Sequence, residues 1–196
     1  MACVVIRREK LNALKAIGVR DSKALTPRAR AKRVGLIEAV SEVVLIRVVE
    51  PEEIDAAVLG ITAANLNDLE ARVAAELLEE VRPRPSVVYV DSPDPIPERY
   101  AAKILSLLSY EATLIADSHA ENKYPVVAAA SIVAKVVRDR LVEELKASYG
   151  DFGSGYPSDP RTREFLRRWV EEKGELPPIV RKSWKTVRNL VGEVGG

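Results

Sequence analysis

Two carboxylates stand where the chain leaves consecutive predicted strands. Residues 87–91 (Val-Val-Tyr-Val-Asp) form an apolar run that ends in Asp91, and the Ser-Pro-Asp-Pro segment that follows cannot continue a strand. Because the run is apolar throughout rather than alternating, it predicts a central strand covered on both faces. Such a strand would present Asp91 at the edge where open α/β sheets bind ligands. The alternative is that Asp91 caps the next turn, and the pattern alone leaves both open.

Asp117 and Glu121 flank the end of the next predicted strand, residues 112–116. Neighbouring strands that each deliver a carboxylate to one edge could share a divalent ion, and ions held in this way promote in-line attack on a phosphodiester. The alternative, which the residues alone favour, is that both acids interact with the dipole of the helix that begins at Pro125. Lys123 could reach a phosphate or could only stabilise the start of that helix.

Composition restricts the chemistry further. The chain has 30 basic and 29 acidic residues, so a nucleic-acid site would have to be a local patch. A single cysteine, Cys3, and a single histidine exclude a disulfide framework, a cysteine-based zinc site and most histidine-based acid–base schemes. Any metal would therefore have oxygen ligands, which suits Mg²⁺ or Mn²⁺. With no long apolar run and no signal peptide, we expect a cytoplasmic protein without a membrane partner.

Strands alternate with helices, which predicts one α/β domain. Strands are expected over residues 2–6, 43–49, 87–91 and 112–116, with the first two paired. Helices are expected over about 8–17, 26–40, 63–81, 125–148 and 161–173, after Pro51 and Pro97, and around Trp184. Residues 161–188 contain nine basic and four acidic residues, so the chain is expected to end in a basic helical appendage.

Two polar stretches could contact a nucleic-acid backbone. Asp21, Ser22 and Lys23 offer a hydroxyl, a cation and backbone amides beside a helix N-terminus, which is a possible phosphate cradle. Residues 181–185 mix Trp184 with cations. For this second stretch we favour the interpretation that Trp184 anchors a solvated helix to the core.

The loop over residues 151–160 is rich in Gly, Pro and Ser and is too long for a simple connector, which favours a binding loop. Gly153 and Gly155 would allow the backbone to approach a ligand closely, and Tyr156 would supply a flat surface for stacking. The alternative is a structured connector in which the tyrosine is packed.

Five stretches carry recognisable motifs, in order and over nearly the whole chain. They are residues 19–26 (Val-Arg-Asp-Ser-Lys-Ala-Leu-Thr), 88–91 (Val-Tyr-Val-Asp), 123–135 (Lys-Tyr-Pro-Val-Val-Ala-Ala-Ala-Ser-Ile-Val-Ala-Lys), 149–159 (Tyr-Gly-Asp-Phe-Gly-Ser-Gly-Tyr-Pro-Ser-Asp) and 177–184 (Pro-Pro-Ile-Val-Arg-Lys-Ser-Trp). Together they resemble ribonuclease HII of the archaeal type. The resemblance implies an RNase H-like mixed sheet flanked by helices over residues 1–148, and a substrate-binding loop and helices over residues 149–196.

The same resemblance implies an activity. It is endonucleolytic cleavage, dependent on Mg²⁺ or Mn²⁺, of RNA in RNA–DNA hybrids and at ribonucleotides embedded in DNA, giving a 3′-hydroxyl and a 5′-phosphate. The family's third metal-binding acid falls on Asp91. Its fourth, normally an aspartate, falls on Glu121, whose extra methylene carries the carboxylate about 1.5 Å further. The tyrosine that senses the ribonucleotide falls on Tyr156, and residues 21–23 lie among the phosphate contacts.

The N-terminal motif of the family is not visible. The family opens with a strand that carries an Asp-Glu pair, followed by a Gly-Arg-Gly loop, whereas this chain begins at what looks like the second strand. The strand not seen is central in RNase H-like sheets and brings two of four metal ligands. Either translation starts upstream of Met1, which the intact motifs favour, or the chain is a truncated, catalytically impaired remnant that binds hybrids.

Two further expectations concern other functions and partners. A junction resolvase of the same fold is disfavoured by the Gly-Ser-Gly-Tyr segment, residues 153–156. No sliding-clamp motif is visible in residues 189–196, so clamp binding is not predicted, and we expect a monomer.

Overall fold

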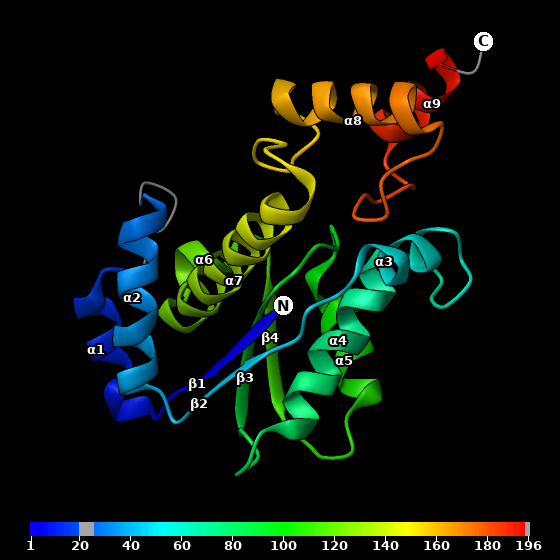
Figure 1. Ribbon diagram of the computed structural model, residues 1–196. Helices are drawn as coiled ribbons and strands as arrows, with labels where there is room; N and C mark the ends of the chain where they lie inside the picture. The colour runs from blue at the N-terminus through cyan, green and yellow to red at the C-terminus, as the bar shows by residue number, and fades with distance from the viewer. Residues whose placement is uncertain (20–25, 195–196) are drawn as a thin grey trace. The chain divides into compact units, whose positions relative to one another are not determined.

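The computed structural model describes residues 1–19 and 26–194 (Figure 1). Contacts divide the chain into two compact units. Unit 1 comprises Met1–Val48 and Asn67–Val137, and unit 2 comprises Val49–Leu66 and Arg138–Gly196. The predicted domain boundary at residue 148 stays a prediction. By contacts alone, residues 138–148 and the distant segment 49–66 group with the C-terminal tail.

Unit 1 contains one antiparallel and one parallel pair of strands. Strand β1 (Ala2–Val5) lies antiparallel to β2 (Val43–Ile46), which confirms the predicted pairing. Strand β3 (Val87–Asp91) lies parallel to β4 (Thr113–Asp117), with Asp91 opposite Asp117. Within the described ranges, these pairs are two separate two-stranded sheets.

Helices surround the strands of unit 1. They are the 3-10 turn η1 (Arg8–Lys10), α1 (Leu11–Ile17), α2 (Pro27–Val40), α4 (Leu66–Glu80), α5 (Pro97–Leu107), α6 (Ala120–Lys123) and the start of α7 (Pro125–Tyr149). Helices α1 and α2 lie side by side, and α5 connects β3 to β4 so that the two strands run parallel (Figure 1). Helix α6 was not predicted.

Local sequence explains where several helices begin. Proline occupies the first turn of α2 and α8 (Pro160–Lys173), where its missing N–H costs nothing. The Thr26 hydroxyl accepts a hydrogen bond from the Ala29 amide at 3.2 Å, which confirms the predicted N-cap of α2. At α8, the Asp159 carboxylate accepts from the Arg161 amide at 2.9 Å.

Strand β3 is covered on one face, and the prediction of cover on both faces was wrong. Val87 is 45% exposed and Tyr89 is 36% exposed, whereas Val88 is buried. Val88 and Val90 face an apolar cluster formed mainly by α4 and α5. Tyr89 lies on the other face, where its ring packs against Tyr124 with centroids 4.6 Å apart. The run is therefore amphipathic in the fold although it is apolar in sequence.

The first part of α7 is buried, as its small apolar residues predict. It packs with β1, α1 and α2 into one core, whose buried members are Val4, Leu14, Val19, Ile37, Ala128, Ala129, Ile132, Val133 and Val136. Alanines at two consecutive buried positions let the neighbouring elements approach the helix axis closely. Among the described residues, no helix combines the length and the apolar composition needed to cross a membrane.

Unit 2 has its own small core. The helices α3 (Pro51–Val58), α8 and α9 (Lys185–Val194) belong to this unit. Leu166, Val180 and Val187 are buried together, and Trp184 packs against them. This confirms the anchoring role of Trp184, although the residue precedes α9 rather than lying within it.

A carboxylate on α3 holds the segment that leads into α9. The two oxygens of Asp55 accept hydrogen bonds from the backbone amides of Lys182, at 2.7 Å, and Ser183, at 3.0 Å. Burial raises the pKa of Asp55, but hydrogen bonds from Ser183 and Lys182 and the charge of Arg181 outweigh it, so that the pKa lies below 3.8. The charged form is therefore the one that stabilises unit 2.

This linkage predicts a pH-dependent effect of Asp55→Asn. Because the pKa of Asp55 is lower in the folded than in the unfolded chain, its contribution is complete above the unfolded value of 3.8 and is lost as pH falls through the folded value. We expect the variant to unfold at lower temperature than the wild type at pH 7, and the gap to narrow from pH 5 to pH 3. Thermal unfolding of both proteins at each pH measures this gap. Glu52→Gln, an exposed change on the same helix, is the control, and a gap that does not vary with pH would contradict the linkage.

Candidate active site

Asp91 ends β3 and reaches across to the segment that follows β4. Its Oδ1 accepts a hydrogen bond from the backbone amide of Ala120 at 2.8 Å, and Ala120 is the first residue of α6. This amide has no partner within its own helix, so the carboxylate satisfies it. Glu121 is the next residue along the chain. The contact therefore fixes the segment that carries Glu121 against the end of β3.

The turn after β3 is closed by other side chains. The Ser92 hydroxyl accepts from the Asp94 amide at 3.1 Å, and the Asp94 carboxylate accepts from the Ile96 amide at 2.8 Å. The alternative in which Asp91 caps this turn is therefore wrong. Asp91 instead joins two segments 29 residues apart in sequence.

Glu121 lies in the first turn of α6 and is partly buried, with its Oε2 inaccessible to solvent. His119 precedes this helix with φ of 56°, in the left-handed region that few residues other than glycine adopt. This conformation turns the chain sharply between β4 and α6. Sequence reasoning missed the turn, and the only signal for it is that histidine tolerates this region better than most residues.

Asp117 ends β4 beside Asp91, but a cation compensates its charge. Lys123 forms an ion pair with Oδ1 of Asp117, and the Tyr124 hydroxyl lies 3.4 Å from Oδ2. The hydrogen bond from Lys123 holds the pKa of Asp117 below its usual value. The charge of Asp117 is therefore already compensated by a cation of the chain. The same ion pair engages Lys123, for which the sequence predicts either a phosphate contact or a role at the start of the next helix.

The carboxylates suit a hard divalent cation that retains water. Magnesium is commonly bound by one or two carboxylates together with water and substrate phosphate oxygens. Asp91 and Glu121 are the two carboxylates that could hold such an ion here, since the Ala120 amide that binds Asp91 directly precedes Glu121 in the chain. Residues 1–19 and 26–194 contain no group of three or more His, Cys, Asp or Glu side chains that could hold a metal by itself.

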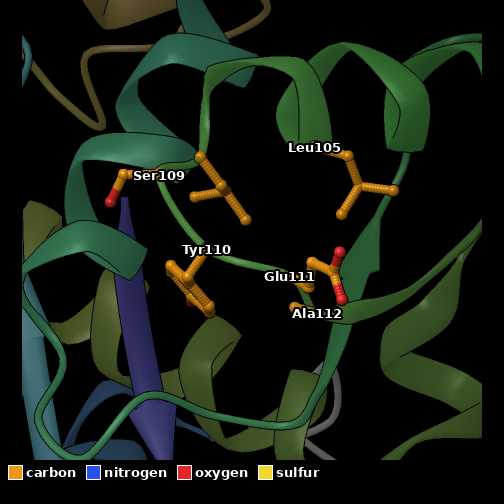
Figure 2. Close-up of a pocket in the computed structure, with 6 residues that line it drawn as sticks. Leu105, Ser109, Tyr110, Glu111 and Ala112 are labelled. Carbon is orange, nitrogen blue, oxygen red and sulfur yellow. The ribbon is translucent and has the colours of Figure 1, made fainter.

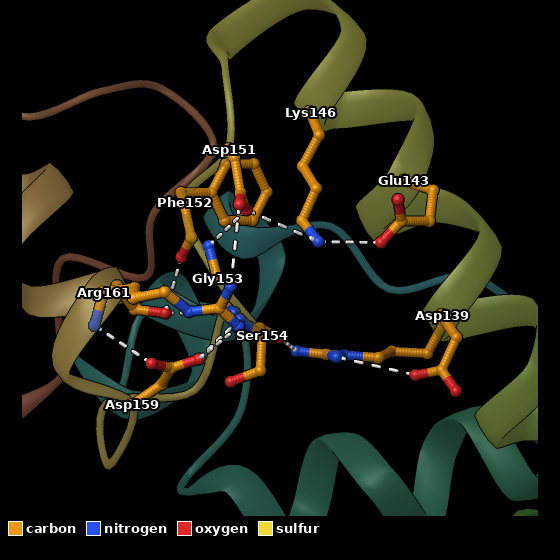
Figure 3. A network of polar contacts seen from close by, with 12 residues as sticks. Asp139, Glu143, Lys146, Asp151, Phe152, Gly153, Ser154, Asp159 and Arg161 are labelled. Atoms are coloured by element: carbon orange, nitrogen blue, oxygen red, sulfur yellow. Dashed lines mark hydrogen bonds and ion pairs between the residues drawn. The ribbon is translucent and has the colours of Figure 1, made fainter. Parts of the chain in front are cut away.

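The loop over residues 151–160 is held by hydrogen bonds within unit 2 (Figure 3). Oδ2 of Asp159 accepts from the Ser154 amide at 2.7 Å, while its Oδ1 caps α8. These hydrogen bonds lower the pKa of Asp159 to about 2. Oδ1 of Asp151 accepts from the Gly153 amide at 2.9 Å.

Thr162, which is buried, completes this bracing. Its hydroxyl accepts from the Gly155 amide at 3.1 Å and donates to the Phe152 carbonyl at 2.8 Å. The amides of residues 153, 154 and 155 thus all donate to side chains of the loop and of α8. These three amides are therefore engaged within the chain.

Gly153 is required by the packing of the loop itself. Its φ is +74°, and a Cβ atom would lie 2.6 Å from Oδ2 of Asp159 and 2.9 Å from Cβ of Arg161. Sequence reasoning had assigned the glycines to close approach by a ligand. In the structure, the groups that approach Gly153 belong to the chain.

Tyr156 is 52% exposed, so the alternative of a packed tyrosine is wrong. One contact is made by Arg138, whose Cζ lies 4.0 Å from the ring centroid. The ring remains accessible for stacking. The predicted phosphate cradle of Asp21, Ser22 and Lys23 lies outside the described residues.

Unit 1 also has a pocket that lies away from Asp91 and Asp117. It has a volume of about 580 Å³ and is lined by Leu105, Leu108, Ser109, Tyr110, Glu111 and Ala112 (Figure 2). These residues precede β4, whereas Asp117 lies at its other end. With a rise of about 3.3 Å per residue, the five-residue strand separates the pocket from the acids by more than ~10 Å.

The ribonuclease HII family model matches residues 1–187 of this chain. The chain belongs to the ribonuclease HII family. It is 50% identical over 192 residues to the ribonuclease HII of Thermofilum pendens, which covers 97% of this chain and 90% of the relative. The crystal structure of ribonuclease H2 from Pyrococcus horikoshii OT3 superposes with a TM-score of 0.88 at 44% identity, over 96% of this chain and 87% of that one.

Membership of the ribonuclease HII family confirms the predicted α/β RNase H-like fold and the prediction of an enzyme, since these proteins are hydrolases that act as endoribonucleases. One expectation meets contrary evidence. A further similar structure, with a TM-score of 0.83 and 39% identity over 96% of this chain and 86% of that one, is the PCNA:RNase HII complex from Archaeoglobus fulgidus. A similar protein of this family therefore does bind this clamp. The expectation of no clamp binding, which was based on the lack of a visible motif in residues 189–196, does not fit this finding.

Proposed function

We propose that this ribonuclease HII family member cleaves the RNA strand of RNA–DNA hybrids and cuts at ribonucleotides embedded in DNA, leaving a 3′-hydroxyl and a 5′-phosphate. The observation that carries the proposal is the hydrogen bond from the Ala120 amide to Asp91, which holds the segment bearing Glu121 beside the carboxyl end of β3. Asp91 and Glu121 are the proposed ligands of Mg²⁺ or Mn²⁺. Such an ion would polarise the phosphate and stabilise charge on the attacking and leaving oxygens.

The other residues have proposed roles in binding. Tyr156 stacks on the sugar of the ribonucleotide, and the 2′-hydroxyl provides the distinction between RNA and DNA. Gly153 and Gly155 act by allowing the loop conformation that presents Tyr156. Asp21, Ser22 and Lys23 contact substrate phosphates, and Lys123 compensates the charge of ionised Asp117 near the substrate.

A cleavage assay tests the proposal. A labelled RNA–DNA hybrid and a DNA duplex with one ribonucleotide are incubated with the chain in Mg²⁺, in Mn²⁺ and in EDTA. We expect cleavage with either ion and none in EDTA, and products that a 3′-hydroxyl-dependent polymerase can extend. Cleavage that persists in EDTA, or products ending in a 2′,3′-cyclic phosphate, would rule out the metal-assisted mechanism.

A second candidate function is binding of hybrids without cleavage. It is favoured by the finding that the described residues contain no group of three or more possible metal ligands. On this alternative the chain binds the hybrid, as measured by fluorescence anisotropy, yet shows no cleavage in either ion. The cleavage assay and the anisotropy measurement together therefore distinguish the nuclease from a protein that only binds hybrids.

A sliding clamp is a candidate partner, on the precedent of the Archaeoglobus fulgidus complex. Size-exclusion chromatography of the chain with an archaeal PCNA tests this, and co-elution would establish the contact.

Tyr156→Ala is expected to reduce activity on a single embedded ribonucleotide by about tenfold relative to a continuous hybrid, because the ribonucleotide sugar loses its contact with the ring. The comparable stacking of a base on an aromatic ring contributes ~1–3 kcal/mol. The ratio of the two cleavage rates is the measurement, and the corresponding ratio of binding constants serves if the chain only binds. Tyr156→Phe keeps the ring and is the control for stacking. Equal ratios for the wild type and the alanine variant would remove the stacking role.

A further inference from the structure

Arg138 makes two contacts with the loop that carries Tyr156. It lies in α7, in the part of that helix that belongs to unit 2. Its Nη2 donates a hydrogen bond to the Ser154 carbonyl at 2.6 Å, and its Cζ lies 4.0 Å from the centroid of the Tyr156 ring. One guanidinium thus touches the backbone two residues before the tyrosine and the tyrosine itself.

The surroundings hold this guanidinium in place. Asp139 lies 3.6 Å from Nη1, and the Arg138 side chain is only 33% exposed. A Cβ atom on Gly155 would lie 3.1 Å from Nη2, which is closer than most side chains tolerate. Gly155 therefore leaves the space in which the guanidinium reaches both of its partners.

Hydrogen bonds hold both backbone polar groups of Ser154, in the middle of the loop. The Ser154 amide donates to Asp159, and the Ser154 carbonyl accepts from Arg138. The Tyr156 side chain has few such restraints, because half of its surface is exposed. A cation over an aromatic ring is favourable by ~0.5–2 kcal/mol, so Arg138 biases the ring towards one orientation.

We propose that Arg138 is a positioning residue for Tyr156: it holds the ring in the orientation in which it meets a ribonucleotide, and so contributes to discrimination between an embedded ribonucleotide and DNA. The inference rests on the proposed role of Tyr156. Arg138 covers part of the ring and leaves the exposed remainder for the sugar. It acts through the tyrosine and does not itself contact the sugar.

The test measures discrimination rather than affinity. Binding constants are determined by fluorescence anisotropy in Ca²⁺ for a DNA duplex with one ribonucleotide and for the same duplex without it. We expect Arg138→Met to lower the ratio of the two constants by about 5- to 10-fold, as loss of a cation over a ring predicts. Arg138→Lys, which keeps the charge and a donor, is expected to recover part of the ratio.

Two controls separate positioning from other effects. Arg140→Met removes an equal charge from an exposed residue of the same helix and is expected to leave the ratio unchanged. A direct contact between Arg138 and a phosphate would instead weaken binding to both duplexes equally and flatten the salt dependence. That outcome would overturn the inference.

A double-mutant cycle completes the test. In the Tyr156→Ala background, Arg138→Met is expected to cause no further loss of discrimination, because the residue acts through the ring. Additive losses would overturn the inference. If Tyr156→Ala alone leaves the ratio unchanged, the proposed role of Tyr156 fails. If Tyr156→Ala lowers the ratio and neither Arg138 variant does, only the role of Arg138 fails.

Discussion

Replacing Asp91 by asparagine is expected to lower metal-dependent cleavage more than about 100-fold, because even residues that only orient a metal ligand contribute ~10–100-fold. The asparagine oxygen can still accept the hydrogen bond from the Ala120 amide, which is 2.8 Å long in the wild type. The connection between β3 and α6 should therefore survive while the charge that binds the ion is lost. Cleavage rates in Mg²⁺ and Mn²⁺ measure the effect. Calorimetric titration with Mn²⁺ alone provides a second readout that does not need substrate.

Two matched variants sharpen this result. Glu121→Gln should behave like Asp91→Asn in both measurements. Asp117→Asn changes the residue opposite Asp91 in the strand register, where Lys123 already compensates the charge, and should cost less than about tenfold. Equal losses for the Asp91 and Asp117 variants would contradict the proposal that the ion is bound by Asp91 and Glu121. Unchanged Mn²⁺ affinity and turnover in Asp91→Asn would remove Asp91 from the site.

Gly153→Ala is expected to destabilise unit 2 by about 2–5 kcal/mol. Left-handed backbone costs a residue with a Cβ atom roughly 1–2 kcal/mol, and forcing atoms into occupied space adds about 1–3 kcal/mol. The occupied space here is formed by Asp159 and Arg161, which lie 2.6 and 2.9 Å from the new atom. Both residues belong to the start of α8, so the loop and the helix cap would be displaced together. Thermal and urea unfolding measure the loss.

Gly174→Ala is the matched control for this substitution. Gly174 has nearly the same φ, +73°, but nothing lies within 4 Å of the position of its Cβ atom. Its substitution should show only the backbone strain, roughly 1–2 kcal/mol. The difference between the two variants isolates the close approach at Gly153. Equal losses would show that contact with Asp159 and Arg161 costs nothing.

Sequence patterns predicted the strands and helices well where the signal is local. The β-formers of residues 87–91 and the Thr-Pro pair at residues 26–27 define β3 and the start of α2 because strand propensity and capping depend on neighbours in the chain. The exposure of β3 could not be predicted in the same way. Whether Tyr89 is covered depends on which elements lie beside the strand, and an apolar run does not record this.

Features of the site that depend on distant contacts were the ones missed. Helix α6 has four residues, too few for periodicity to indicate, and its first amide is satisfied by Asp91, 29 residues away. Asp55 looks like an ordinary solvated acid on α3, yet it binds amides 127 and 128 residues further along. The roles of Asp91 and Glu121 as metal ligands stay predictions, and the connection between the two residues through Ala120 was visible only in the folded chain.

The bracing of residues 153–155 has a consequence for binding kinetics. Fixing the backbone of a flexible residue costs ~1–2 kcal/mol of conformational entropy, and a floppy loop would incur this cost when the substrate arrives. Here Asp151, Asp159 and Thr162 have already ordered the loop in the free chain. Ordering of the loop should therefore not limit the association rate. Differences in affinity among substrates should arise mainly from differences in the dissociation rates of the complexes.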